Sequence, residues 1–522
     1  MKKMKVMKVI SFLFQLSIPN LLLSSFSKAE EVQESTNIAN NEILRIENPT
    51  NLANNENFRF ESTTIVTTEV EITYTSDSSG FNPDEPCDCD STTQTSVYAS
   101  EFEKKCPGSK LGTRVVGYYA AYNDELQSIA SIPFKNYTDL LFFTVSPLQN
   151  GTFDFDGPKS VWAKKAKEFV KRSKENCVRP ILGTGGWNGS RFFSKLLSTP
   201  EKRKVYAENL MKLIDEFGFE GFDFSWIYPG KQGVGCNSIS PNDLTNFSEF
   251  LALIKTGGKQ PWISISGYIG GIAGPPGKDE KTIIAYKKIV ASVDYVILMT
   301  YDVYGSWSDT TGPSAPLYDE CNDADNKFSV QSAVKLYLSL SFQPKQLIIS
   351  IANFGHGWKL KSNVIKGTKF PNGATSYIYQ KHTKAIIPGG PSDSKPGGLD
   401  ICGKPTNHTG TFQIKELLKL GMLSRDLSHG TGGFDRGFDQ CSGVPYIISR
   451  AKKILITYDD VDSVKLKMKF ILSSKLGGIA FFDTNGAIPE MIIAAKVLVE
   501  NSNNPIGVEN KTSNPSVKHL NT

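Results

Sequence analysis

From about residue 111 onward the chain alternates between short apolar runs and longer amphipathic runs, and this alternation constrains the fold more than any other feature. Eight apolar runs have the length of β-strands; they lie at 115–119, 140–145, 180–183, 221–227, 262–266, 295–301, 347–352 and 478–482. Amphipathic runs such as 161–174 and 200–217 separate them. Strands that alternate with helices in this way predict an α/β protein built as a parallel (β/α)8 TIM barrel.

The sequence divides into five parts around this barrel. We predict a barrel at 112–500 with a small insertion domain between strands seven and eight, because the Gly- and Pro-rich stretch at about 359–446 is too long for one helix. Residues 30–111 are rich in Asn, Ser, Thr and Glu and predict a polar, flexible leader with at most one strand near 64–74. Residues 501–522 form a polar tail.

Residues 1–29 have the pattern of a cleaved signal peptide. Lysines precede a mostly apolar run at 9–23, and Ser27-Lys28-Ala29 supplies small residues at the cleavage spacing. The alternative is a short membrane anchor, but the apolar run is interrupted and shorter than the ~20 residues of a spanning helix. We therefore expect a secreted, extracellular protein without a membrane span.

Composition argues against several partners. The chain has 522 residues, 39% of them hydrophobic and 21% charged, as in soluble globular proteins. Its net charge of +5 is small for this length and its charges are interspersed. We therefore expect neither a nucleic-acid partner nor a membrane-surface or acidic ligand; a protein partner cannot be inferred.

Eight cysteines in an exported chain suggest disulfide bonds. Because eight cysteines allow 105 pairings, we predict only one bond, between Cys402 and Cys441, which bracket much of the Gly-rich insert. Cys87 and Cys89 resemble half of a metal knuckle but have no histidine nearby, so we predict no metal site and no cofactor. Six sequons predict glycosylation at Asn136, Asn150, Asn188, Asn246, Asn407 and Asn510.

The fourth strand carries the residues most informative about function. Side chains alternate faces along a strand, so Gly221, Asp223, Ser225 and Ile227 share one face. The aromatic residues between them share the other face and suit a strand covered by helices. From these residues alone, a buried strand with one hydrogen-bonded aspartate is an equally good interpretation.

The stretch 219–229 resembles the acid-carrying strand of the family-18 glycoside hydrolases, which carries Asp-Gly-x-Asp-x-Asp-x-Glu followed by Tyr-Pro. Asp223, Tyr228 and Pro229 fall in register with that motif. Ser225 stands where the family has the second aspartate, and Ile227 stands where it has the proton-donating glutamate. The resemblance implies a chitin-related fold whose catalytic motif is degenerate.

Other motifs extend the resemblance over about 111–499. Gly185-Gly186-Trp187 resembles the family's third-strand motif, and Met299-Thr300-Tyr301-Asp302 resembles its sixth-strand motif. Residues 312–318 are similar to the loop that follows, and Tyr118 stands where the family has a first-strand aromatic residue. Insert segments 402–407 and 438–442, and residues 458–460 just beyond it, resemble secreted fungal chitinases and the chitinase-like subunit of yeast killer toxins.

The resemblance also implies which chemistry is lost. Chitin cleavage in the family is substrate-assisted, and a glutamic acid protonates the leaving oxygen. Isoleucine has no proton to donate, and Ser225 cannot share a charge with Asp223. Tyr304 stands where a histidine is common, and Phe482 where the family has a tryptophan under the sugar. Asp302 or Glu320 could replace the acid only by coming within hydrogen-bond reach of the glycosidic oxygen.

Sugar binding needs fewer groups than catalysis. The predicted sugar-binding residues are Tyr118, Trp187, Asp223, Tyr228, Met299, Tyr301, Asp302 and Trp307. Aromatic residues such as Trp187 and Tyr301 could instead be core residues, and for Trp307 and Trp358 neither interpretation is favoured. Three functions remain: a chitin or chito-oligosaccharide binder without catalysis, a chitinase with a relocated acid, and an interaction module of a toxin-like complex.

Overall fold

The computed structural model describes residues 101–106, 112–274, 276–322 and 326–503. The predicted signal peptide, nearly all of the leader, Cys87, Cys89, Asn510 and most of the polar tail lie outside these residues. Within the described part, no helix is both long and apolar enough to cross a membrane.

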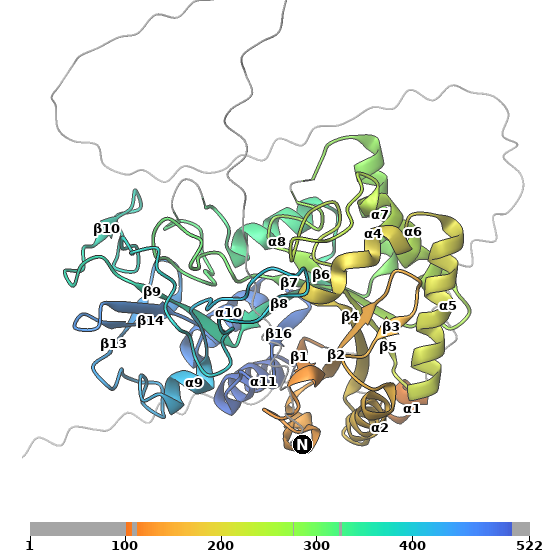
Figure 1. The fold of residues 1–522 in the computed structure, drawn as a ribbon, viewed down its shortest axis with the longest axis horizontal. Helices are drawn as coiled ribbons and strands as arrows, with labels where there is room; N and C mark the ends of the chain where they lie inside the picture. Colours follow the sequence, from red (N-terminus) through yellow and green to blue (C-terminus); the bar gives the residue numbers. More distant parts are fainter. Residues whose placement is uncertain (1–100, 107–111, 275, 323–325, 504–522) are drawn as a thin grey trace, which may run out of the picture. The chain divides into compact units, whose positions relative to one another are not determined.

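Eight parallel strands form the closed barrel that the sequence predicts (Figure 1). They are β1 (Arg114–Ala120), β2 (Asp139–Pro147), β4 (Arg179–Gly185), β5 (Gly221–Ser225), β6 (Trp262–Tyr268), β7 (Tyr295–Met299), β8 (Leu347–Ala352) and β16 (Gly478–Phe482). Going round the barrel, the order is β1, β2, β4, β5, β6, β7, β8 and β16, and β16 pairs with β1 to close it. The short β3 (Phe153–Asp154) extends β2 at the edge.

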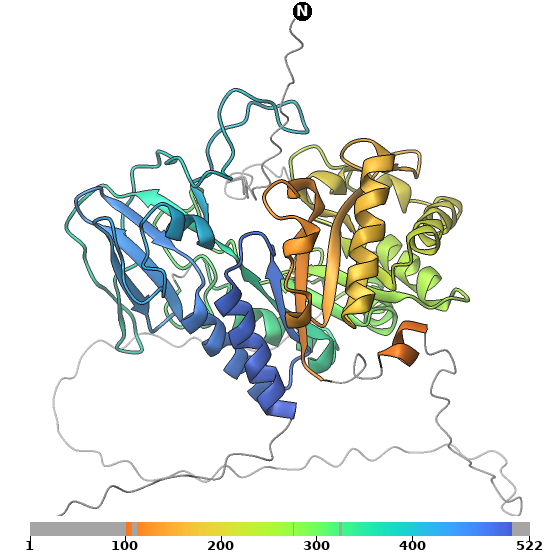
Figure 2. The same ribbon diagram turned by 90° about the horizontal axis from the view of Figure 1, so that it is seen from below.

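Helices cover the outside of this barrel (Figures 1 and 2). They are α2 (Lys159–Glu175), α5 (Pro200–Phe217), α6 (Asp243–Thr256), α7 (Glu280–Ser292), α8 (Val330–Ser339), α10 (Val461–Ser473) and α11 (Pro489–Asn503). Shorter helices, α3 (Gly186–Gly189) and α4 (Phe193–Leu196), follow β4.

Local sequence signals set the start of the fourth barrel strand. The Thr199 side chain caps the first turn of α5 by accepting from the amide of Lys202, and Pro200 occupies the first helical position. Gly218, at φ 80°, ends the helix in the left-handed conformation that glycine adopts without strain. The chain then enters β5 within three residues, so the end of α5 fixes where β5 begins.

The two faces of β5 point as predicted. Phe222, Phe224 and Trp226 pack in the large core between strands and helices. Ile227, just beyond the strand, packs in the separate cluster inside the barrel. Apolar burial on both faces makes the strand a fixed platform for the polar side chains it carries.

The insertion domain is larger than predicted. A five-stranded antiparallel sheet in the order β12, β9, β15, β14, β13 extends from residue 354 to 457, beyond the predicted 359–446 at both ends. Its strands are β9 (Phe354–Lys359), β12 (Thr411–Gln413), β13 (Asp435–Asp439), β14 (Val444–Ser449) and β15 (Ile454–Thr457), with α9 (Ile414–Lys419) beside them and a β10 (Thr368–Lys369) and β11 (Thr375–Ser376) hairpin. The predicted first residue of the insertion domain lies too far along the chain, because only one residue separates β8 from β9 and no loop signal marks the boundary.

The barrel domain also begins earlier than residue 112. Helix α1 (Glu101–Lys105) places Phe102 in a buried position, and the Cys106–Cys177 disulfide attaches this segment to the end of α2. The buried Arg179 guanidinium lies 5.8 Å from the Phe102 ring. The last described residues of the predicted leader are therefore part of the packed domain.

The predicted Cys402–Cys441 bond is wrong. Cys402 pairs with Cys236, and Cys441 pairs with Cys321. Both partners lie on loops at the carboxyl ends of barrel strands, because the insert folds back over the barrel instead of closing on itself.

The described sequons differ in exposure. Asn150 and Asn407 are exposed, whereas Asn136, Asn188 and Asn246 are half-buried. The Asn246 side chain already accepts a 3.3 Å hydrogen bond from Arg203. Glycosylation at these positions stays a prediction.

Candidate functional site

Asp223 is the carboxylate at the centre of the candidate site. It lies inside the barrel on β5 and is fully buried. The hydroxyl of Ser225 donates to its Oδ2 at 2.6 Å, and the hydroxyl of Ser264 donates to its Oδ1 at 2.7 Å. Burial raises the pKa of Asp223 to about 6, although hydrogen bonds from Ser225, Ser264 and Tyr118 oppose the rise. Asp223 is therefore a carboxyl held by hydroxyls, and among the described residues no second carboxyl donates to it or accepts from it.

Ile227 occupies a fixed position above Asp223. Its side chain is 2% exposed. Its amide donates to the Ser190 hydroxyl at 2.9 Å, and its carbonyl accepts from the Asn237 side chain at 2.8 Å. Because both backbone groups are bonded and the side chain is an alkane, this position supplies no proton.

The mouth of the barrel is filled with side chains. The remaining space has a volume of about 10 Å³, near the minimum for one water. Its walls are Tyr118, Phe143, Gly186, Trp187, Ser225, Ile227, Ser266, Met299, Tyr301 and Phe482. We call this set the mouth cluster; it is too tightly packed to hold a sugar ring.

The structure thus brings together five of the predicted sugar-binding residues as packing partners: Tyr118, Trp187, Tyr228, Met299 and Tyr301. Tyr118 makes edge contacts with Phe143 and Phe482 at centroid distances of 5.4 and 5.3 Å. Trp187 and Tyr301 are 7% and 6% exposed. Tyr228 is buried beside the cluster, with its ring 5.2 Å from that of Tyr268. In this closed arrangement none of them presents an open aromatic platform.

Asp302 and Trp307 lie at a different place, beside β9. A 2.7 Å hydrogen bond links Asp302 Oδ1 and His356 Nε2, and both side chains are buried. The Trp307 ring meets the His356 ring edge-on at 5.2 Å. Trp358, for which sequence favoured neither role, is a core residue whose indole N–H donates to the Gly305 carbonyl at 2.9 Å.

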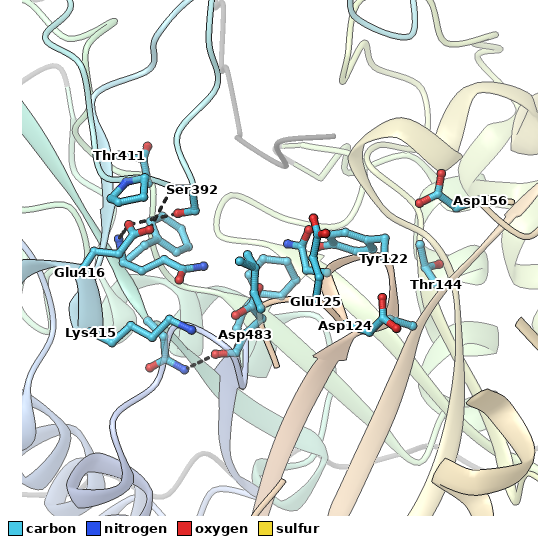
Figure 3. Close-up of a pocket in the computed structure, with 18 of the residues that line it drawn as sticks. Tyr122, Asp124, Glu125, Thr144, Asp156, Ser392, Thr411, Lys415, Glu416 and Asp483 are labelled. Carbon is cyan, nitrogen blue, oxygen red and sulfur yellow. Dashed lines mark hydrogen bonds between the residues drawn. The ribbon is translucent and has the colours of Figure 1, made fainter. Parts of the chain in front are cut away.

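A much larger cavity, about 640 Å³, lies between the barrel and the insert (Figure 3). On the barrel side it is lined by the loop 121–126 after β1, by Asp156, and by Phe482 and Asp483 at the end of β16. On the insert side it is lined by Phe354 and His356 of β9, and by residues of the 391–419 region. Phe482 lines both this cavity and the mouth space, so this side chain separates the two.

Charged side chains of both signs line the cavity. Figure 3 shows Asp124, Glu125 and Asp483 on the barrel side, facing Lys415 and Glu416 from the insert. Burial raises the pKa of Asp483, and the Lys415 ammonium opposes that rise. Burial lowers the pKa of Lys415. Asp483 accepts from the Gly486 amide at 2.8 Å and Lys415 donates to the Asn485 side chain, so both charged groups are held in place at the cavity wall.

Glu416 is already satisfied within the insert. Its carboxylate accepts from the Ser392 amide at 2.8 Å, the Ser392 hydroxyl at 3.0 Å and the Gln413 amide at 2.9 Å. It therefore shapes the cavity wall and is not available as an acid. Asp124 is paired with Lys165 at 2.7 Å.

Sequence reasoning missed this cavity. Tyr122 and Asp483 follow the ends of the first and eighth strands closely, and the carboxyl ends of barrel strands are where TIM-barrel sites lie. That rule could have selected these two positions. No sequence signal selects Ser392, Lys415 or Glu416, because their approach depends on how the insert folds back.

The fold, the inward Asp223 and the strand-end motifs define a class of protein. Residues 114–486 match the family described as glycosyl hydrolases family 18, and the chain belongs to this family. It is a chitinase-like protein.

Its curated relatives include a chitinase-like effector of Moniliophthora roreri. That protein is 29% identical over 383 residues, which span 72% of this chain and 90% of the relative. A chitinase-like effector of Moniliophthora perniciosa is 28% identical, over 73% and 85% of the two chains. Chitinase A1 of Niallia circulans is 26% identical, over 61% and 42%.

Solved structures show the same fold. A chitinase from Rhizomucor miehei superposes with a TM-score of 0.63 at 20% identity, over 74% of this chain and 99% of that one. A chitinase mutant from Cycas revoluta, solved in complex with (GlcNAc)4, gives 0.57 at 21% identity, over 74% and 99%.

Proposed function

We propose that this protein is a secreted chitinase-like protein that binds chito-oligosaccharides without cleaving them. The observation that supports the absence of cleavage most strongly is the pair of substitutions at the catalytic strand. Ile227 offers an alkyl group where the family places its acid, and Ser225 leaves Asp223 without a carboxyl partner. General-acid protonation is typically worth ~10²–10⁴ in rate.

The two candidate replacement acids are poorly placed. Asp302 is buried and bonded to His356, and Glu320 is exposed next to the Cys321–Cys441 disulfide. Neither lines the mouth space or the large cavity. Neither geometry offers a proton beside Asp223, so the structure gives no support to the relocated-acid alternative.

Binding is proposed for the cavity between barrel and insert, not for the closed mouth. A volume of about 640 Å³ falls in the range of small-molecule sites, ~300–1,000 Å³. Its walls combine the rings of Tyr122, Phe354 and Phe482 with carboxylate and ammonium groups. Rings that stack on sugars beside groups that bond hydroxyls are what an oligosaccharide site requires. The similarity to the Cycas revoluta chitinase, whose complex holds (GlcNAc)4, supports this ligand class.

The test combines binding and turnover on the purified protein. We expect chitotetraose to bind in calorimetry, the protein to be retained on chitin beads, and a chromogenic chito-oligosaccharide to stay intact. Turnover above background would favour an active chitinase. A folded protein that binds neither ligand would favour an interaction module without a sugar site.

A further inference from the structure

Two disulfides attach the insert to one side of the barrel mouth. Cys236 follows β5 and bonds Cys402, and Cys321 follows β7 and bonds Cys441. In the ring of strands, β6 and β7 separate β5 from β8, after which the insert begins. The Cys236–Cys402 bond, joining residues 166 apart, therefore connects loops from two separated parts of the ring. The large cavity opens over the other part, at β16, β1 and β2.

The loop that carries Cys236 lies directly over the position of the missing acid. We call residues 229–242 the mouth loop. Its Asn237 side chain donates to the Ile227 carbonyl at 2.8 Å, and Val234 packs against the mouth cluster. A side chain at Gly233 would place its Cβ 2.3 Å from the Ile227 carbonyl oxygen. The backbone of the loop at Gly233 therefore packs directly against the backbone at Ile227, which only glycine allows. The mouth loop is thus a cover fitted closely to Ile227.

The insert supplies the other half of the connection. In the insert loop, which we define as residues 391–406, the carboxylate of Asp400 accepts from the amides of Cys402 and Lys404 at 2.9 and 2.8 Å. These bonds shape the turn that presents Cys402. The Cys402 sulfur also lies 3.7 Å from the Val234 carbonyl, so the two loops touch at the bond.

We propose that the Cys236–Cys402 bond holds the mouth loop in place and closes the sugar-binding cleft at one end. The protein then binds a chito-oligosaccharide by the end of its chain. A chain lying in the cavity reaches Phe482, beyond which only about 10 Å³ remains. It cannot continue across the mouth while the mouth cluster fills that space and the mouth loop, through Val234 and Asn237, holds the cluster closed over Ile227. The ligand class is thus a short chito-oligosaccharide or a free chain end. The choice of ligand rests on the proposed function. The restraint of the mouth loop by the Cys236–Cys402 bond, which we call the lock, does not depend on it.

The first test is the dependence of affinity on ligand length. Calorimetry with fully acetylated oligosaccharides from the disaccharide to the hexasaccharide should show affinity that rises and then stays constant in the unmodified protein. In Cys236→Ser/Cys402→Ser we expect affinity to keep rising with length, because the freed loop no longer presses Val234 against the mouth cluster and the side chains that fill the mouth can separate. The matched control is Cys106→Ser/Cys177→Ser, which removes a bond far from the mouth cluster, next to α1, and should keep the plateau.

The second test needs no ligand. Hydrogen exchange of the amides in 229–242 should be roughly tenfold faster in Cys236→Ser/Cys402→Ser than in the unmodified protein, with the β5 amides unchanged. Unchanged exchange in the mouth loop would overturn the lock. If the mouth loop exchanges faster but affinity still stays constant for the longer oligosaccharides, the bond does not limit the length of the bound ligand. If no oligosaccharide binds to either form, the proposed sugar function fails, and exchange alone decides whether the bond is a lock.

Discussion

Ser225 donates a 2.6 Å hydrogen bond to Asp223, two residues earlier on the same strand. Compared with the aspartate pair of the family motif, Ser225 and Asp223 still form a hydrogen bond between neighbouring inward side chains, but only one of the two can carry a charge. A pair of carboxylates in this place would share a proton and couple their titrations. A serine beside a carboxyl cannot do so. Asp223 is therefore retained as a buried hydrogen-bonding centre of the barrel.

The first prediction is that restoring the acid alone will not restore cleavage. Ile227→Glu should show no turnover above background, because the new carboxyl enters a packed mouth of about 10 Å³ without a partner acid. Ser225→Asp/Ile227→Glu should recover weak turnover at most. Release of a chromophore from a chito-oligosaccharide measures both. Strong turnover by the unmodified protein, lost in Asp302→Ala or Glu320→Ala, would contradict the loss of catalysis.

The second prediction concerns stability and pH. Burial raises the pKa of Asp223 from 3.8 to about 6, so the folded protein binds the proton more tightly than the unfolded chain does. Stability from this group is present below the unfolded pKa and is lost as pH rises through about 6. Two pKa units correspond to roughly 3 kcal/mol. Relative to the unmodified protein, Asp223→Asn should therefore gain stability between pH 4 and pH 7.

Denaturant unfolding at several pH values measures that difference. Asp243→Asn is a useful comparison, since burial also raises the pKa of Asp243 but its oxygen accepts from loop amides of Gly230 and Ser240. A difference between Asp223→Asn and the unmodified protein that does not change with pH would contradict the assigned ionisation.

The sequence predicted the barrel well because its signals are local. The strand β5, for example, combines an apolar run with a nearby helix signal, the Thr199 cap and the Gly218 end of α5. The inward position of Asp223 followed from the two-residue period of a strand. These features depend on neighbours in sequence and need no knowledge of the insert.

The parts that were missed depend on distant contacts. The pairing of Cys402 with Cys236 follows from the insert folding back across the ring of strands, which no spacing rule records. Likewise, Trp187 follows β4 as predicted, but Phe143 and Phe482 pack with it and close the mouth. The ligand cavity lies between Asp483 of the barrel and Lys415 of the insert, residues that no local pattern connects.

The third prediction assigns sugar binding to the cavity. Phe354→Ala should weaken chitotetraose binding about tenfold, because a ring stacked on a sugar is worth on the order of 1 kcal/mol or more. Phe354 lines the cavity and its ring lies 5.7 Å from that of Tyr301. Val364→Ala, at an insert residue that is 63% exposed and outside the cavity, is the control. Equal affinities for both variants would remove Phe354 from the site.

The fourth prediction separates packing from binding at Trp187. Trp187→Ala should weaken retention on chitin, but chiefly through stability, since the ring is 7% exposed within the mouth cluster. Truncating a buried tryptophan costs about 3–5 kcal/mol. Thermal unfolding measured beside chitin retention distinguishes the two. A variant of normal stability that no longer binds chitin would show that Trp187 touches the ligand directly.

The last prediction concerns the opposite end of the barrel. Asp139 is fully buried there and accepts from Arg179 at 2.8 Å and from Arg114 at 3.3 Å. Burial alone would raise the pKa of Asp139, but the two guanidinium groups and the Thr138 hydroxyl lower it overall. Its stabilising contribution is therefore present above the unfolded pKa and is lost as pH falls through the lower folded pKa.

Asp139→Asn should destabilise the protein by about 3–5 kcal/mol at pH 7, because the buried Arg179 loses its 2.8 Å ion pair with Asp139 and keeps the longer, 3.9 Å pair with Glu103. The loss should shrink as pH falls below about 4, because the unfolded chain binds a proton at Asp139 there, whereas the folded protein does so only at lower pH. Asp309→Asn is the matched control: Asp309 pairs with Lys384 at 2.6 Å, but its side chain is 100% exposed. Exposed pairs contribute little to stability, so the control should unfold like the unmodified protein. Equal denaturant midpoints for the two variants would show that the buried network does not hold this end of the barrel together.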